Sequence, residues 1–221
     1  MNKDKLKSTL GSFLSVVLDL ILLNVYWIVC ALPVITAGPS TSAMFTCMLK
    51  IARDELGEST TKTFFRAFKE NFKNSFWYGI IALAAAAIIY IDFTYALYQT
   101  GILRKVFFVV SGTLILIWLI YTSYIFALQA RYENTFKNQI KNAFLLAFCA
   151  PGKTLMMWII WAIPVALIFI LPGEVLAYLG SIYLMVGASG PAYFNSKILR
   201  SVFDKFVKGD DNDKTASEEI S

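Results

Sequence analysis

Long apolar segments alternate with short basic ones along most of the chain, and this pattern predicts a membrane protein built from helices. A helix needs roughly 20 mostly apolar residues to cross a hydrocarbon core of about 30 Å. Six segments approach that length: 9–32, 39–56, 75–98, 106–129, 154–171 and 175–195. We therefore expect an all-α fold, a polytopic transmembrane helical bundle of about six spans arranged as three hairpins.

The second segment, Pro39–Leu56, is the weakest of the six. It follows a break at which Pro33, Gly38 and Pro39 interrupt the apolar run. Proline suits the first turn of a helix and glycine suits the position before it, so a new helix is expected to begin at Pro39. Eighteen helical residues cover about 27 Å. The segment therefore either just spans the membrane or forms a re-entrant helix, and both alternatives stay open.

The distribution of basic residues tests this count of spans. With a cytoplasmic N-terminus and six crossings, 18 of the 20 lysines and arginines lie on the inner side, and only Arg104 and Lys105 lie outside. Cytoplasmic loops of membrane proteins carry an excess of lysine and arginine. The charges therefore favour six spans with both termini in the cytoplasm, or a second helix that returns to the same side.

Two inner loops, Thr61–Ser75 and Arg131–Phe148, carry phenylalanines at helical spacing with basic residues on the opposite face. Such a pattern is typical of an amphipathic helix lying in the membrane interface. The alternative is an ordinary inner loop with aromatic anchors. The basic residues that we expect to contact lipid or a partner protein are Arg66, Lys69, Lys73, Lys137 and Lys141.

Composition supports a single membrane domain. The 221 residues are 57% hydrophobic, with a mean hydropathy of +0.61, whereas soluble domains are about 45–50% apolar. We assign residues 1–208 to one membrane-embedded helical domain. Residues 209–221 are acidic and lack aromatics, which predicts a disordered tail.

Few residues are suited to catalysis or metal binding. Histidine is absent, and Cys30, Cys47 and Cys149 are scattered without a C-x-x-C spacing. This argues against zinc or haem sites and against a Cys–His or Ser–His nucleophile. We expect no enzyme activity, no cofactor and no metal. The net charge of +5 fits cytoplasmic loops better than nucleic-acid binding.

Several polar residues lie within apolar segments. Asp19 lies near the middle of the first span, where an acidic residue costs about 2.5–3.5 kcal/mol, so it should face the bundle or a cavity. Exposed backbone N–H groups after Pro39 would make a partly positive helix end, which transporters use to hold polar groups. Interhelical hydrogen bonding or a simple turn are the structural alternatives. The candidate polar or ligand-site residues are Asp19, Asn24, Thr36, Gly38, Pro39, Ser40, Thr41 and Asp92.

Several motifs resemble one known family. Asn24–Trp27, Leu32–Pro39 and Ser42–Met44 are similar to the hallmark of the YesL-like family, and Phe64–Lys73 and Arg131–Asn134 also fit it. The resemblance covers roughly residues 11–208. It implies a small integral membrane protein of a Gram-positive bacterium, without established activity, whose genes often accompany sugar ABC-transporter and glycan-degradation genes. No catalytic residue can be carried over.

Two functions remain in competition. The first is an accessory or regulatory membrane component of ABC-type carbohydrate uptake. The second is a small stand-alone transporter of a polar solute that uses Asp19 and the broken helix near Pro39. For either function we expect a multi-pass protein of the bacterial cell membrane. Its expected partners are the lipid bilayer and either sugar ABC-transporter subunits or further copies of itself, but not nucleic acid.

Overall fold

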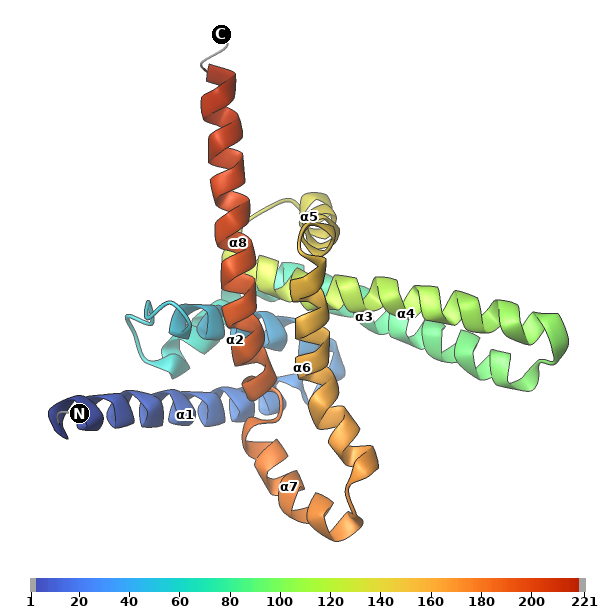
Figure 1. Ribbon diagram of the computed structural model, residues 1–221, viewed down its shortest axis with the longest axis horizontal. Coiled ribbons are helices and arrows are strands. Elements are labelled where there is room, and N and C mark those ends of the chain that lie inside the picture. Colours follow the sequence, from blue (N-terminus) through green and yellow to red (C-terminus); the bar gives the residue numbers. More distant parts are fainter. Residues whose placement is uncertain (1–2, 219–221) are drawn as a thin grey trace. The chain divides into compact units, whose positions relative to one another are not determined.

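The computed structural model describes the backbone of residues 3–218. Side chains are described over 11–205, except for residues 12, 168–169, 173–174 and 176–178. Helices are the only regular secondary structure in this part of the chain, which contains no strand, and this confirms the all-α class (Figure 1). The elements are α1 (Lys3–Ala31), a 3-10 turn η1 (Val34–Thr36), α2 (Ala37–Ile51), α3 (Thr60–Tyr98), α4 (Gly101–Arg131), α5 (Phe136–Cys149), α6 (Pro151–Ile170), α7 (Gly173–Val186) and α8 (Ser189–Glu218).

Within the described residues, three helices are long and apolar enough to cross a membrane. They are residues Phe13–Ala31 of α1, the whole of α3 and the whole of α4. A fourth span results if α5 and α6 are counted as one broken span. The arrangement of six spans is therefore not confirmed. Helix α2 has only 15 residues and α7 only 14, which correspond to about 22 and 21 Å.

Several predicted boundaries differ from the observed ones. Segment 61–75 is not a separate interfacial helix, because α3 continues without a break from Thr60 to Tyr98 and contains no proline to stop it. The second predicted interfacial segment is partly correct: α5 is a separate helix, but residues 131–135 are not part of it. The predicted span 175–195 is interrupted at Gly187 and Ala188, where α7 ends and α8 begins.

The C-terminal segment is described as far as Glu218, where α8 ends. Residues 219–221 lie outside the described part of the chain. Disorder of this tail stays a prediction.

The chain divides into two compact units that interleave along the sequence. Unit 1 contains residues up to 26, residues 44–64 and residues from 150 onward, and unit 2 contains residues 27–43 and 65–149. Because α1, α2 and α3 each pass from one unit to the other, the units are not successive domains. A single membrane-embedded domain over 1–208 stays a prediction.

Unit 2 is organised around the hairpin of α3 and α4, which run side by side (Figure 1). Side chains of α4 donate hydrogen bonds to backbone carbonyls of α3: Trp118 Nε1 to Ala82 O at 2.8 Å, and Tyr121 Oη to Tyr78 O at 3.1 Å. Helix α5 joins them through Phe136, whose ring stacks on Tyr78 with centroids 4.7 Å apart. These hydrogen bonds between apolar helices stabilise the packing of α4 against α3, as interhelical hydrogen bonds do in membrane proteins.

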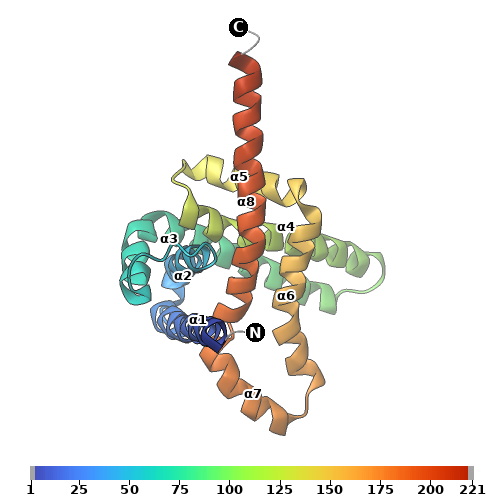
Figure 2. The ribbon, with the colours of Figure 1, turned by 60° about the vertical axis from the view of Figure 1, so that its left-hand side comes forward.

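Unit 1 joins the N-terminal part of the chain to the C-terminal helices. Helix α6 packs against α8, and α7 connects their far ends (Figure 2). Its most buried large side chains include Leu23 of α1, Met48 of α2, Met157 of α6, and Leu199 and Phe203 of α8. Residues more than 150 positions apart in the sequence therefore share one core.

Candidate functional site

The break between α1 and α2, residues 32–39, is held by hydroxyl groups that bond back to the backbone. Thr36 Oγ1 donates to Cys30 O at 2.6 Å, and Ser40 Oγ donates to Trp27 O at 3.0 Å. The last carbonyls of a helix have no partner within the helix. Thr36 therefore supplies a partner for a carbonyl in the last turn of α1, and Ser40 ties the start of α2 to Trp27 just before that turn.

Thr41 closes the same turn from the other side. Its hydroxyl donates to Ala37 O at 2.7 Å and accepts from Trp27 Nε1 at 3.0 Å. The indole of α1 is therefore tied to the first turn of α2. Of the predicted ligand residues, Thr36, Ser40 and Thr41 all use their hydroxyls within the protein.

Backbone contact brings the start of α2 against α3. A Cβ added to Gly38 would lie 2.2 Å from Ser75 O and 3.0 Å from Gly79 Cα, so only glycine fits there. One turn along, Ser75 Oγ donates to Ser42 Oγ at 2.8 Å, and Ser42 Oγ donates to Phe126 O at 3.4 Å. Small residues permit close helix approach in membranes. This geometry gives the break a packing role, and its ligand role stays a prediction.

Asn24 connects α1 to the junction of α7 and α8, and it is 1% exposed. Its Nδ2 donates to Leu184 O at 2.7 Å, while its Oδ1 accepts from Ala188 N at 3.0 Å and Ser189 N at 3.1 Å. One side chain therefore caps the end of α7 and the start of α8, both of which leave backbone groups without helical partners.

Asp19 lies elsewhere in unit 1. Its Oδ1 accepts a 2.5 Å hydrogen bond from Thr60 Oγ1 at the start of α3, where Thr60 is 5% exposed. Two turns along α1, Tyr26 Oη lies 2.9 Å from Thr61 Oγ1. Asp19 therefore contacts α3 while Asn24 contacts α7 and α8, and the structure does not combine them in one site.

Asp92 belongs to the α3–α4 hairpin of unit 2. Its Oδ2 accepts a hydrogen bond from Ser111 of α4, and Ser111 is 1% exposed. The predicted acidic and amide residues thus occupy three separate places. Each has a hydrogen-bond partner within its own unit.

The predicted basic contacts lie at the surface. Arg66, Lys69 and Lys73 of α3 are exposed, as are Lys137 and Lys141 of α5. On α5 the positions buried within the chain are Gln139, Ala143, Leu146 and Ala147, which lie outside the predicted phenylalanine face. Phe136 and Phe148 are themselves exposed.

Sequence reasoning missed an ion-pair network in unit 1. Arg53 Nη2 lies 2.6 Å from Asp204 Oδ1, and Arg200 Nε lies 3.8 Å from Asp204 Oδ2. Arg200 Nη1 also donates to Ala52 O at 2.6 Å, just after the end of α2. The i,i+4 spacing of Arg200 and Asp204 was the available sequence signal, but the approach of Arg53 depends on the tertiary fold.

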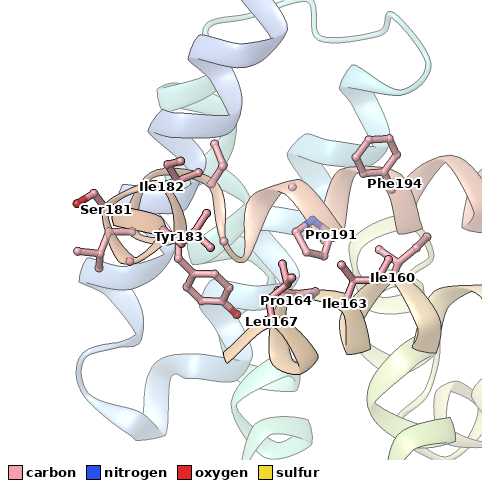
Figure 3. Close-up of a pocket in the computed structure, with 15 residues that line it drawn as sticks. Ile160, Ile163, Pro164, Leu167, Ser181, Ile182, Tyr183, Pro191 and Phe194 are labelled. Carbon is pink, nitrogen blue, oxygen red and sulfur yellow. The ribbon is translucent and has the colours of Figure 1, made fainter. Parts of the chain in front are cut away.

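Two apolar cavities accompany these polar contacts. A groove of about 1040 Å³ lies in unit 1 between α6, α7 and α8 (Figure 3). A smaller cavity of about 290 Å³ lies in unit 2 between α3, α4 and α5. Over the described residues, no group of three or more cysteine, aspartate and glutamate side chains is placed to hold a metal ion.

An all-helical chain with at least three helices of this length and hydropathy indicates an integral membrane protein. A family model described as "Protein of unknown function, DUF624" matches residues 20–93. The uncharacterized protein YesL of Bacillus subtilis (strain 168) is 30% identical over 152 residues, which cover 67% of this chain and 71% of that protein. The chain therefore belongs to the YesL-like DUF624 family, as its motifs predict. No solved structure matches the chain significantly.

Proposed function

We propose that the protein is an accessory or regulatory component of ABC-type carbohydrate uptake in the bacterial cell membrane. The observation that carries the proposal is that the polar side chains of its apolar helices find their hydrogen-bond partners within the chain. Ser40, Thr41 and Asn24 each bond to backbone or side-chain partners of the chain itself. Polar groups arranged in this way stabilise helix packing, which suits a protein that supports a transporter. The carbohydrate association rests on the family resemblance.

The test is purification of the tagged protein from its native membrane, with an unrelated tagged polytopic protein as control. We expect sugar ABC-transporter subunits to co-purify with this chain and not with the control. A deletion strain should also take up one labelled glycan more slowly than its parent. Purification of the protein alone, together with unchanged uptake of every glycan tested, would contradict the proposal.

We also propose a topology of six crossings with both termini in the cytoplasm. The charge distribution supports it, because 18 of 20 basic residues then face inward. The short helices α2 and α7 then supply the second and sixth crossings, the latter continued by the start of α8. Single cysteines at Val34 and Glu58, both exposed, should react with an impermeant thiol reagent from opposite sides. Reaction of both from one side would exclude a crossing by α2.

A second candidate is a small transporter of a polar solute. The observation in its favour is the Asp19 carboxylate on a membrane-spanning helix, held there by Thr60. If this candidate is correct, Asp19→Asn abolishes uptake or proton coupling at unchanged protein level, because the amide cannot carry the charge. Thr60→Val serves as a control that removes the hydrogen bond and keeps the carboxylate. Normal flux in Asp19→Asn would remove this candidate.

A further inference from the structure

The groove between α6, α7 and α8 has predominantly apolar walls. Ile160, Ile163 and Leu167 of α6 face Pro191 of α8 and Tyr183 of α7 across it (Figure 3). Its volume of about 1040 Å³ lies near the upper end of the roughly 300–1000 Å³ typical of small-molecule sites. Apolar walls of this kind fit a hydrocarbon chain.

Two glycines in the wall leave open space. A Cβ added to Gly180 of α7 or to Gly190 of α8 would meet no atom within 4 Å. Packing within the chain therefore does not require glycine at these positions, in contrast to Gly38. Because both glycines line the groove, a bulky side chain at either position is expected to reduce its volume, and its Cβ would not collide with the backbone.

The wall on α6 continues towards the inner side into a lysine. Lys153 precedes Ile160 by seven residues, and residues seven apart lie within about 20° of one another around a helix. Two turns of helix, about 10.5 Å of rise, separate them. The face of α6 that lines the groove therefore ends in the Lys153 ammonium group, which is half-buried.

The wall on α8 ends in the same way. Gly190 and Phe194 line the groove, and Lys197 and Ser201 follow at spacings of three and four residues on the same face. Lys197 is exposed, and its Nζ lies 4.5 Å from the centre of the Tyr193 ring. Lys153 Nζ donates to Ser201 Oγ at 2.7 Å, so the two walls meet at this end.

We propose that this groove binds an anionic phospholipid of the inner leaflet, with an acyl chain between α6, α7 and α8 and the phosphate at Lys153 and Lys197. Charge complementarity selects this occupant. An ammonium group has three donors, and Ser201 accepts one of those of Lys153. Basic residues next to a membrane attract anionic lipids, and both lysines lie on the side that the charge distribution assigns to the cytoplasm.

The experiment is native mass spectrometry of the purified full-length protein with phosphatidylglycerol or phosphatidylcholine of identical acyl chains. We expect the wild type to retain phosphatidylglycerol preferentially. Lys153→Gln/Lys197→Gln should weaken phosphatidylglycerol binding by roughly 30-fold and leave phosphatidylcholine binding unchanged. The matched control Lys62→Gln/Lys105→Gln loses the same charge at exposed positions outside the groove and should retain the preference.

The proposed binding of an acyl chain in the groove is tested separately, by variants whose larger side chains fill the groove. Gly190→Leu, and Gly180→Leu as a second variant, should lower the binding of both lipids. The control Gly112→Leu introduces the same side chain on α4, where a Cβ also meets no atom within 4 Å, and should bind like the wild type. Melting temperatures in detergent identify any variant that fails to fold.

Three results would overturn the proposal. The first is equal binding of the two lipids by the wild type. The second is a phosphatidylglycerol preference that survives Lys153→Gln/Lys197→Gln. The third is that the wild type forms a dimer that retains no lipid and that Gly190→Leu dissociates this dimer. Such a result would show that a second copy of the chain occupies the groove.

Discussion

The chain breaks its helices twice before a Gly-Pro pair, and the two breaks are stabilised differently. Before Gly38-Pro39, hydroxyls on neighbouring residues bond to the end of α1, and the glycine contacts the backbone of α3. Before Gly190-Pro191, the distant side chain of Asn24 caps both helix ends, and the glycine borders an open groove. The same sequence signature therefore marks a tightly packed turn in unit 2 and a groove wall in unit 1.

The largest expected effect is the loss of stability when Gly38, but not Gly190, is replaced by alanine. Gly38→Ala should destabilise the protein by about 3 kcal/mol, because its Cβ would overlap Ser75 O and neither backbone can yield easily. Gly190→Ala is the matched control and should lie within about 0.5 kcal/mol of the wild type. Thermal unfolding in detergent, followed by circular dichroism, measures both. Equal shifts for the two variants would show that the breaks do not differ in packing.

Removal of the Asn24 cap should have the next largest effect. Asn24→Ala leaves Leu184 O, Ala188 N and Ser189 N without their partner, and the loss of buried partners costs about 2 kcal/mol. Hydrogen exchange should accelerate at residues 184–190 and remain unchanged at the first break. The exposed Asn74→Ala serves as control. Unchanged exchange at 184–190 would contradict the capping role.

A smaller effect is expected at the serine pair beneath the first break. Ser42→Ala should cost about 1 kcal/mol, since it removes the bonds to Ser75 and Phe126 O. In a double-mutant cycle, Ser42→Ala and Ser75→Ala should be less than additive, because both remove the same hydrogen bond. The free-energy changes of Gly190→Ala and Ser42→Ala should be additive, because these two residues share no contact. Full additivity of the serine pair would mean that their hydrogen bond contributes nothing.

The smallest effect concerns the ion pairs that Asp204 makes in the middle of α8. Asp204→Asn should destabilise the protein by about 0.5 kcal/mol, because Asp204 is partly exposed and such pairs are screened by water. The difference from wild type should shrink as salt is raised. Unfolding midpoints at low and high salt measure it, with Glu133→Gln as an exposed control. A difference independent of salt would point to packing instead.

Helix positions were predictable where the apolar signal was long. The predicted segment 106–129 lies within α4, and 154–171 nearly coincides with α6. The segment 175–195 was wrong as a single helix, because its apolar run hides the interruption at Gly187 and Ala188. The amphipathic stretch 61–75 was predicted as a helix separate from the span 75–98. The two form one helix, because the stretch contains no residue that stops it.

The candidate polar residues were found by their chemistry, but their partners were not. Asp19, Asn24 and Asp92 stand out because polar side chains in apolar helices need partners. Their partners Thr60, Leu184 and Ser111 are ordinary residues at no fixed spacing from them. A contact across 160 positions leaves no local pattern in one sequence.

The sequence by itself determined that this protein is helical and suited to a membrane, that it belongs to its family, and that its first apolar run breaks before Gly38. These properties follow from apolar length and from proline and glycine, whose effects on the backbone are local. Only the tertiary structure decided that Gly38 touches Gly79 and that Asn24 caps a distant junction. Such roles depend on which surfaces meet, because a hydrogen bond or a close contact forms only between groups that the fold brings together.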